Sequence, residues 1–532
     1  MKTRQMERNV LVTLLATAAT VHCVCSYNIL AIFPFSGKSH FVMFKTISEA
    51  LAAKGHNITV VSHFPKSSQS SHAEKQWKGN YIDYSIKDTV PVFENITIEE
   101  VFGNGIFREM LIILDDGLDN CNGVMSSGRL NDLMNAGAKY DLVLVEVFNT
   151  GCFISAGSRF GAPVIGVTST SFYPWYGGLV GDMINPAYVP VNLLPFTSQM
   201  SFIERLINAA TLTLIRIVYA FKYEPEAQAI VDKHLGKSNQ TIKESMENVN
   251  MVIMNTHFAL GDPRPVPQGI VEVGGCTYKS PNPLPQDLEQ YITGATRGVI
   301  YFSMGSILKG ASLPTDKAMA FLRAFQRLPT GYKVLWKWEE KMPGGFQPDN
   351  VKFVSWTPQF DVLNHPNVKL FISHCGLLGI LDALYTGVPI IGIPMFADQF
   401  SNMNFITDQG CGERLKYDKI DEHIVFHTMT TILGDQRYAW NAKRLSMLYR
   451  DRPVDPLDNA IFWIEYVAEY GVNLFRPTPL PWYSYCSLDL VGLAVLASTV
   501  AAYWIGRCAR LSWSSARRTV WNRPLPAGLK LR

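Results

Sequence analysis

Several patterns that mark common nucleotide or metal sites are missing from this chain of 532 residues. No Gly-x-Gly-x-x-Gly follows a predicted strand, and the glycine-bounded run at residues 123–128 continues with Arg129 and Leu130 instead of Lys and Ser or Thr. Dinucleotide and P-loop sites therefore lack support. There is no Asp-x-Asp triplet to clamp a diphosphate through a metal ion, and we predict no metal site.

Charge and cysteine are also sparse. Charged residues make up 17% of the chain and the net charge is only +3, so no global basic field indicates a nucleic-acid partner. The nine cysteines are scattered, without zinc-ligand spacing or a dense disulfide framework. One disulfide is possible and none is required.

The N-terminus has the pattern of a secretory signal peptide. Lys2, Arg4 and Arg8 precede an apolar run at residues 10–24, and small residues follow it. We predict a signal peptide over residues 1–26, although a first buried strand or helix is the alternative.

The C-terminus has the pattern of a membrane anchor. Residues 490–506 are uncharged and almost wholly apolar, and the tail after Gly506 contains Arg and Lys but no Asp or Glu. We predict a transmembrane helix at residues 486–506 and a basic cytoplasmic tail at residues 507–532, which makes the chain single-pass type I with a luminal body. The alternative is a buried core helix.

Three sequons, at Asn57, Asn95 and Asn239, agree with a luminal body. Asn57 opens an apparent buried strand, so its glycosylation is doubtful.

Between the two ends, the order of apolar segments predicts two α/β domains. The first begins with a strand at residues 28–33, a helix at 40–54 and a β-branched strand at 58–62, which is a βαβ unit of a parallel sheet. Further buried strands are expected at residues 141–146 and 164–168. A second series begins after the Pro-rich stretch 281–285, with strands expected at residues 298–302, 334–338, 352–354, 370–373 and 390–393. We therefore predict domains at residues 27–282 and 283–485, with a ligand cleft between the carboxyl ends of their strands.

A long apolar helical stretch lies at residues 196–223, with Arg205, Arg216 and Lys222 spaced along it. It could be an amphipathic membrane-surface element or a lid packed on its own domain. We expect the packed lid, because an apolar helical stripe usually faces a core.

Polar residues gather at predicted strand ends within residues 356–399. His374 stands where a strand gives way to a helix near Gly376, and the small residues there would let a phosphate approach the free N–H groups of the helix start. Asp382 lies two turns along that helix and could accept hydrogen bonds from the paired hydroxyls of a ribose.

The same run contains two further candidates. Trp356 follows a strand in a loop, where its ring could stack on a base. Asp398 and Gln399 follow another strand and offer an acceptor and an amide to sugar hydroxyls. Each residue alone is more often structural, but their arrival at successive strand ends favours a nucleotide-sugar site.

This run closely resembles the signature of the UDP-glycosyltransferase family, in its membrane-bound branch of insect glucosyltransferases and vertebrate glucuronosyltransferases. The resemblance extends over nearly the whole chain and includes residues 298–306, 450–453 and 456–460. It implies two Rossmann-like domains facing a cleft (GT-B type) plus a C-terminal transmembrane helix.

The resemblance also implies roles for individual residues. Trp356 would stack on uracil, Gln359 would bind uracil or ribose, and Asp382 would hold the ribose hydroxyls. The diphosphate would lie on His374, Gly376 and Ser306, and the transferred sugar on Asp398 and Gln399. Three positions depart from the family pattern: Cys375 replaces the usual Gly, Asp382 replaces Glu, and Leu378 replaces an Asn of vertebrate members.

The first domain would supply the catalytic base. Residues 33–40 resemble the family's histidine segment, so His40 would take the proton of the acceptor hydroxyl. A carboxylate must hold the tautomer of such an imidazole and stabilise its cation. The family has Asp at the end of the strand near residue 145, and this chain has Glu146 there.

The expected reaction is inverting transfer of a sugar from a UDP-sugar co-substrate to a hydroxyl of a small lipophilic acceptor, as in detoxification or in pigment or hormone conjugation. We expect UDP-glucose as the donor, because the sequence of residues 374–379 resembles that of insect members. We expect no permanently bound cofactor. The resemblance likewise implies residence in the endoplasmic reticulum membrane. A homo-oligomer is possible. The departures at Glu146, Asp382 and Leu378 motivate an alternative: a non-catalytic membrane protein that binds UDP-sugars. The sequence does not identify the acceptor.

Overall fold

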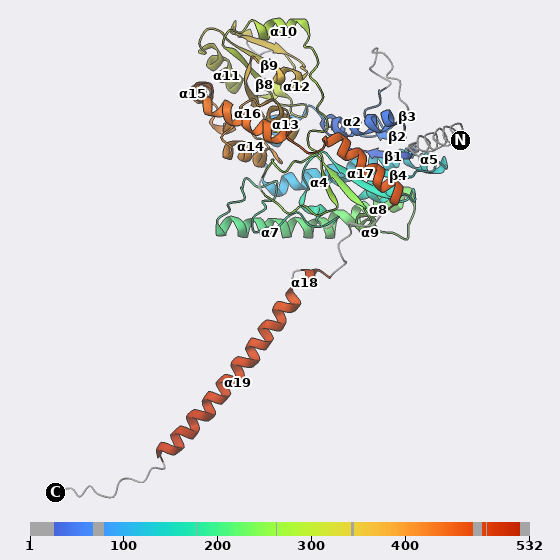
Figure 1. The fold of residues 1–532 in the computed structure, drawn as a ribbon, viewed down its shortest axis with the longest axis vertical. Helices are drawn as coiled ribbons and strands as arrows, with labels where there is room; N and C mark the ends of the chain where they lie inside the picture. The colour runs from blue at the N-terminus through green and yellow to red at the C-terminus, as the bar shows by residue number, and fades with distance from the viewer. Residues whose placement is uncertain are drawn as a thin grey trace, which may run out of the picture. The chain divides into compact units, whose positions relative to one another are not determined.

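The structure is a computed structural model that describes residues 26–66, 79–177, 179–261, 263–341, 345–471, 481–485 and 487–521. Two parallel β-sheets with flanking helices lie in one compact unit that ends at Arg476. The second unit contains the C-terminal helix (Figure 1). The predicted signal peptide, apart from Ser26, and the end of the basic tail lie outside the described residues.

The first sheet has seven strands in the order β3-β2-β1-β4-β5-β6-β7, and all neighbours are parallel. The strands are β1 (Asn28–Phe33), β2 (Asn57–Ser62), β3 (Tyr81–Ser85), β4 (Leu142–Glu146), β5 (Val164–Thr168), β6 (Met251–Met254) and β7 (Ile270–Glu272). β1 pairs directly with β4, with Ile32 opposite Val145. The loop after Phe33 and the side chain of Glu146 therefore lie at the same edge of the sheet, where the carboxyl ends of the strands meet.

The helices of the first domain are α2 (Lys38–Lys54), α4 (Ile106–Ser126), α5 (Arg129–Asn135), α6 (Cys152–Ser158), α7 (Phe202–Val218), α8 (Glu224–Leu235) and α9 (Ile242–Glu247), with short helical turns η2 (Pro174–Tyr176) and η3 (Tyr219–Tyr223). The short helix α3 (Ile98–Val101) lies between them in sequence but packs on the core of the second domain through Ile98. Helix α2 buries Phe41, Phe44, Ile47 and Leu51, as their spacing predicts. It ends at Gly55, whose φ of 109° a residue with a side chain rarely adopts.

The second sheet has the order β10-β9-β8-β11-β12-β13 and is also parallel. Its strands are β8 (Gly298–Ser303), β9 (Tyr332–Lys337), β10 (Val351–Val354), β11 (Val368–Ser373), β12 (Ile390–Gly392) and β13 (Gly412–Arg414). Its helices include α10 (Gln286–Thr293), α11 (Thr315–Gln326), α12 (Gln359–Asn364), α13 (Leu377–Thr386), α14 (Gln399–Asp408), α15 (Glu422–Gly434) and α16 (Gln436–Arg450). The fold class of two Rossmann-like domains is confirmed.

Helix α17 (Pro456–Tyr470) returns from the second domain to the first. It lies beside α2 (Figure 1). Its buried residues Ala460, Ile461 and Ile464 belong to the same core cluster as Phe41 and Phe44 of α2. Helix α17, near the end of the predicted second domain at residues 283–485, therefore packs on the first domain and connects the two domains.

The second unit contains α18 (Trp482–Tyr485) and α19 (Leu488–Trp521). Residues Leu488–Arg517 form a helix long and apolar enough to cross a membrane, and within it the side chains are unburied. The helix begins within the span predicted at residues 486–506 and continues past Gly506 through Arg507 and Arg510.

The expectation for residues 196–223 of a segment packed on its own domain is met, but the apolar stripe does not face the core. Helix α7 does lie against the first domain, but it buries a narrow and partly polar stripe of Asn208, Thr211, Leu212 and Ile215. Most of its large apolar side chains are exposed to solvent.

A disulfide between Cys121 and Cys152 joins α4 to the start of α6. We expect Cys121→Ser to lower the free energy of unfolding by about 3–4 kcal/mol, because the bond closes a loop with a sequence separation of 31 residues. Thermal melts in detergent would show the loss as a lower Tm. Cys411→Ser, at a buried free thiol, is the control. A reductant should lower the Tm of the wild type and leave that of Cys121→Ser unchanged; equal effects on both would contradict the prediction.

Candidate active site

The predicted base and its carboxylate partner are in contact. His40, in the first turn of α2, has its Nδ1 3.0 Å from Oε1 of Glu146, the last residue of β4. The other oxygen of Glu146 accepts a hydrogen bond from the backbone N–H of Phe35 at 3.1 Å. Both side chains are buried from bulk water. Because Nδ1 faces the carboxylate, Nε2 is the nitrogen left to take a proton.

The loop between β1 and α2 is held from two sides. The carbonyl of Pro34 accepts from Nδ2 of Asn120 on α4 at 2.9 Å and lies 2.9 Å from Nε2 of His63, just after β2. These contacts, with the bond from Phe35 to Glu146, fix the backbone immediately before His40. A base whose donor and acceptor geometry is set by packing needs little reorganisation during proton transfer.

Aromatic rings surround His40. Its ring centroid lies 4.5 Å from that of Phe35 and 4.5 Å from that of Phe148, which follows β4 by two residues. Phe93 stands 5.4 Å from Phe35, and Tyr173 stands 5.3 Å from Phe148. The first domain therefore surrounds the predicted base with an apolar, aromatic wall.

In the second domain, His374 follows β11 and sits between two glycines. A Cβ on Gly305 would lie 2.4 Å from Cε1 of His374, and a Cβ on Gly376 would lie 2.5 Å from its Nε2. Burial, together with the nearby Lys337 cation, lowers the pKa of His374 to about 4. The ring is therefore neutral near pH 7 and would act on a phosphate through a hydrogen bond instead of a full charge.

The start of α13 is open to an anion. Its N-cap residue is Gly376, which has no side chain to bond the first N–H groups of the helix. Ser306 is exposed in the loop after β8, next to Gly305. Free helix N–H groups, a neutral imidazole and a hydroxyl are a set of donors suited to a diphosphate.

The backbone conformation of Cys375 explains why the family usually has Gly at this position. Its φ is +69°, in the left-handed region, and the residue is fully buried. Its N–H donates to Oγ of Ser373 at 3.1 Å, which supports the turn locally. The chain therefore keeps the backbone path at a steric cost of about 1–2 kcal/mol.

We expect Gly305→Ala to weaken UDP binding at least about tenfold, equivalent to ~1.4 kcal/mol. The added methyl would both meet His374 and stand at a φ of +83°. Isothermal titration with UDP measures the change. Gly434→Ala is the matched control, since nothing lies within 4 Å of the position of its Cβ. Unaltered UDP affinity in Gly305→Ala would show that His374 does not line the diphosphate site.

The two residues predicted at the ribose are bonded to each other. Nε2 of Gln359, at the start of α12, donates to Oδ2 of Asp382 at 2.8 Å, and the hydroxyl of Tyr278 donates to Oδ1 at 2.9 Å. Burial raises the pKa of Asp382 to about 6, against the effect of these two hydrogen bonds. Each oxygen keeps a second lone pair with which it could accept from a hydroxyl. Trp356, just before this helix, is 66% exposed, so its ring is accessible to a base.

The residues predicted at the sugar have different surroundings. Asp398 accepts from Nδ2 of Asn402 at 2.9 Å, and burial raises its pKa, although Asn402 and the nearby His40 lower it. The side-chain oxygen of Gln399 accepts from the backbone N–H groups of Met395 and Phe396. Gln399 therefore holds the loop, and only its Nε2 remains to reach a ligand. The proximity of Asp398 to His40 brings the two domains' polar groups together.

Glu109 was not predicted from the sequence. It lies on α4 of the first domain, and its carboxylate accepts from the backbone N–H of Ala397 in the second domain at 3.2 Å. Burial raises the pKa of Glu109 to about 7, although the bond from Ala397 lowers it. Ala397 itself has a φ of +53° and packs into the core of the first domain. The only sequence signal was a lone Glu on an amphipathic helix, which does not indicate a contact 288 residues away.

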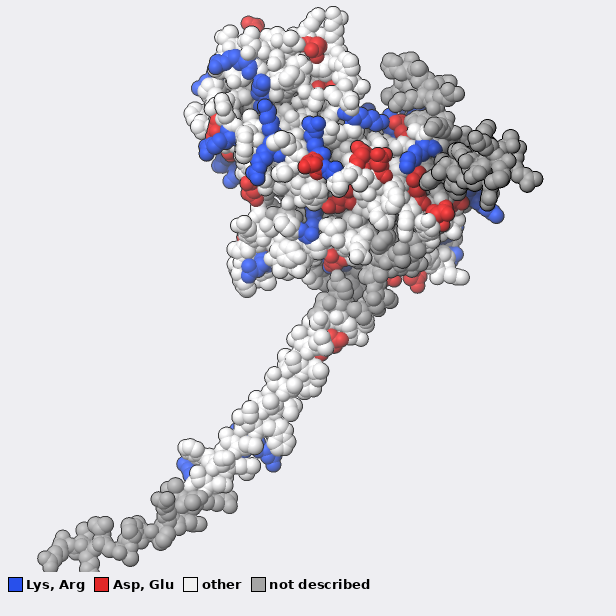
Figure 2. All heavy atoms as spheres, in the orientation of Figure 1, with Lys and Arg blue, Asp and Glu red and all other residues white. Residues whose placement is uncertain are grey.

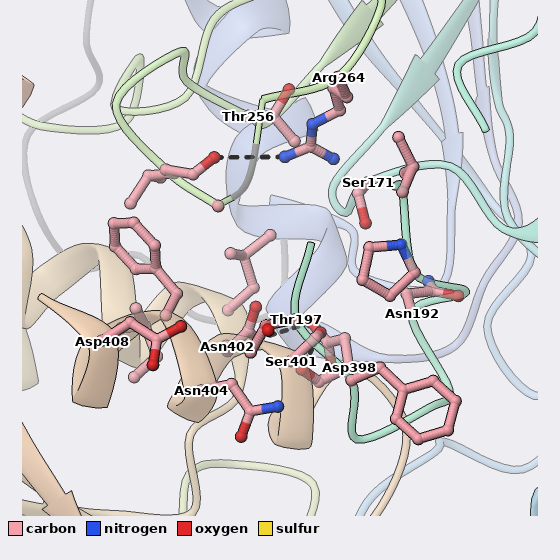
Figure 3. Close-up of a pocket in the computed structure, with 18 residues that line it drawn as sticks. Ser171, Asn192, Thr197, Thr256, Arg264, Asp398, Ser401, Asn402, Asn404 and Asp408 are labelled. Carbon is pink, nitrogen blue, oxygen red and sulfur yellow. Dashed lines mark hydrogen bonds between the residues drawn. The ribbon is translucent and has the colours of Figure 1, made fainter. Parts of the chain in front are cut away.

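A cavity lies between the domains beside these groups (Figure 3). Asp398, Ser401 and Asn402 line one side, and Arg264, Thr256 and Ser171 line the other. The cavity also touches Leu377 at the start of α13, next to the predicted phosphate donors, and Asp398 is the one predicted site residue that lines it. Among the described residues, no group of His, Cys, Asp and Glu could hold a metal ion.

Two facing Rossmann-like domains, with an open helix start in one and a His–Glu pair in the other, define a nucleotide-sugar glycosyltransferase. The sequence profile of UDP-glucoronosyl and UDP-glucosyl transferases matches residues 29–520, and the chain belongs to that family. It therefore transfers sugar from a UDP-sugar donor to an acceptor.

Individual relatives agree. UDP-glycosyltransferase UGT5 of Dactylopius coccus is 35% identical, over 90% of this chain and 91% of its own length. UDP-glucuronosyltransferase 2A2 of Homo sapiens is 30% identical, over 92% of each chain. A solved structure of the glycotransferase of kitacinnamycin has a TM-score of 0.54 at 15% identity and covers 85% of this chain and 100% of its own, which shows the likeness of fold expected for the GT-B type.

Proposed function

We propose that this protein is an inverting UDP-glucosyltransferase that acts on hydroxyl groups of small lipophilic compounds. The observation that carries the proposal is the 3.0 Å contact between His40 and Glu146, close to Asp398 across the cleft. A base alone would not identify a sugar transferase, and a nucleotide site alone would not transfer. The contact of Glu109 with Ala397 and the effect of His40 on the pKa of Asp398 bring the two groups close to each other, which supports a complete reaction centre.

The proposed reaction starts with the acceptor hydroxyl at Nε2 of His40. As the hydroxyl oxygen attacks the anomeric carbon, its proton moves to Nε2, and Glu146 stabilises the imidazolium through Nδ1–H. The bond from the anomeric carbon to the diphosphate breaks through an oxocarbenium-like state. The N–H groups at the start of α13 and His374 stabilise the negative charge that develops on the departing UDP. Attack opposite the leaving group gives a β-glycoside from an α-linked donor.

Donor roles follow the geometry of the second domain. Trp356 would stack on uracil, the bonded pair of Gln359 and Asp382 would hold the ribose, and Asp398 with Nε2 of Gln399 would hold the sugar. Glucose is favoured because one relative, 32% identical over 87% of this chain, is a UDP-glucosyltransferase 2 of Dactylopius coccus. The aromatic wall around His40 supports a lipophilic acceptor, with detoxification or pigment or hormone conjugation as the role.

We place the enzyme in the endoplasmic reticulum membrane, with the catalytic body in the lumen and the basic tail in the cytosol. The Cys121–Cys152 disulfide fits an oxidising compartment. Two sequons, at Asn95 and Asn239, are exposed. At the third, Asn57, the side-chain nitrogen donates to Asn28 at 3.0 Å.

The test is transfer by microsomes that contain the full chain. They would be incubated with radiolabelled UDP-glucose or UDP-glucuronate and a panel of phenols, and the anomeric configuration of the product read by NMR. We expect β-glucosides and little transfer from UDP-glucuronate. Preference for UDP-glucuronate would overturn the donor, and UDP binding without any transfer would favour a non-catalytic UDP-sugar-binding protein.

A further inference from the structure

Helix α7 exposes a largely apolar face. Six large side chains on it are between 43% and 69% exposed: Phe202, Ile203, Leu206, Ile207, Leu214 and Ile217. In the next turn, Phe221 is 82% exposed. At 100° per residue the six cover an arc of about 140°, with no charged residue inside it. Figure 2 shows a mostly uncharged surface along the edge of the body where α7 runs in Figure 1.

Polar contacts lock the helix in this orientation. On its buried side, Oδ1 of Asn208 accepts from the N–H of Val191 at 2.8 Å, and Nδ2 donates to the carbonyls of Pro186 and Val189. Arg216 bonds Asp182 and the carbonyl of Pro174. Rolling the helix to bury its apolar arc would break these contacts inside the protein. Polar residues of α7 therefore face the protein and most of its large apolar residues face outward, which is the reverse of the usual amphipathic arrangement.

An exposed apolar face of this kind is typical of a surface that contacts a partner. A monomer in water rarely exposes a contiguous apolar patch of more than a few hundred Å², and larger patches mark a protein or membrane contact. The large side chains of the arc are Phe, Ile and Leu, with the small residues Ala210 and Thr213 among them, and the Thr213 hydroxyl donates to the carbonyl of Ala209. Arg205 and Lys222 stand exposed near the two ends of the arc. Apolar side chains with basic residues beside them are typical of helices that lie in the bilayer interface.

The chain length makes a bilayer the favoured occupant. Residues 472–487 join the body to α19 and can span at most roughly 60 Å, because each residue extends no more than about 3.6 Å. With α19 in a membrane, the face on α7 is always held at a high effective concentration next to lipid. A second copy of the chain has no such tether.

We propose that α7 and η3 lie flat on the bilayer, with the apolar arc in the boundary between lipid headgroups and acyl chains. This inference rests on the anchoring by α19 and not on the transfer reaction. A chain of rings leads inward from this face: Tyr219 lies 6.4 Å from Trp175, which stacks at 4.7 Å on Tyr173 beside Phe148 and His40. The membrane contact thus adjoins the wall of the proposed acceptor site.

The test uses the full chain in phosphatidylcholine nanodiscs that contain a diazirine-labelled phosphatidylcholine. After illumination, peptides are mapped by mass spectrometry. We expect lipid adducts on α19 and on residues 202–221. The double substitution Leu206→Glu with Ile217→Glu, at exposed positions, should reduce adducts on α7 at least about tenfold while those on α19 stay unchanged. Phe258→Glu, at an exposed phenylalanine outside α7, is the control and should change neither.

Three results would overturn the proposal: adducts confined to α19, adducts on α7 that the double substitution leaves unchanged, and cross-links between two copies of α7 in place of lipid adducts. Transfer measured on the same nanodiscs separates this test from the proposed reaction. An inactive protein can still show adducts on α7, and an active protein can lack them.

Discussion

His40→Ala should lower kcat by about 10²–10⁴-fold while UDP binds as before. The imidazole is the group placed to take the acceptor proton, with Nδ1 held by Glu146 and its ring between Phe35 and Phe148. The loss corresponds to roughly 3–5 kcal/mol of transition-state stabilisation. UDP would bind in the other domain, so its Kd should change less than about twofold. Radiolabelled transfer and calorimetry with UDP measure the two effects separately.

His423→Ala is the matched control, because His423 is exposed on α15. It should leave both kcat and the Kd for UDP unchanged. A His40→Ala enzyme that retained full transfer would remove His40 from the mechanism. A variant that lost UDP binding together with activity would instead indicate a distorted cleft, and its Tm would show whether the fold was affected.

Local patterns predicted much of the fold. The βαβ start was readable because strand, turn and helix are adjacent in sequence, and Gly55 ends α2 through its own φ. Strand β5 was predicted with its observed bounds, since a short β-branched run is buried on both faces. Strands β3, β6, β7 and β13 were not predicted. Three of them (β3, β7 and β13) lie at sheet edges, and β7 and β13 have only three residues each, so little hydrophobic signal marks them. Strand β6 lies inside the first sheet but has only four residues.

Long-range partners were not readable. Asp382 was singled out for a ribose, but the bond from Tyr278 comes from 104 residues away and has no motif. The carboxylate of Glu109 reaches the loop at Ala397 only because the two domains meet there. The side of α7 that faces the protein was not readable either. Its apolar arc predicted burial, whereas the contacts of Asn208 with the loop at residues 186–191 decide which side faces the protein.

The carboxylate behind His40 should be nearly as important as the base. We expect Glu146→Gln to lower kcat by about 10²–10⁴-fold, because a neutral amide neither stabilises the imidazolium nor fixes the tautomer that leaves Nε2 unprotonated. The side chain keeps its length, so the N–H of Phe35 can still be satisfied at the 3.1 Å position. The Kd for UDP should stay constant. Glu99→Gln, at an exposed carboxylate, is the control.

Glu146→Asp separates geometry from charge. Asp is one methylene shorter, so its carboxylate would reach either His40 or the N–H of Phe35 but not both without a backbone shift. Since Glu146 spans the two at 3.0 Å and 3.1 Å, we expect a loss of roughly tenfold, smaller than that of Glu146→Gln because the charge remains. The opposite result has a specific meaning. If the wild type binds UDP without turnover and Glu146→Asp gains activity, the longer carboxylate has uncoupled the dyad, and the chain is a UDP-sugar-binding protein that no longer transfers.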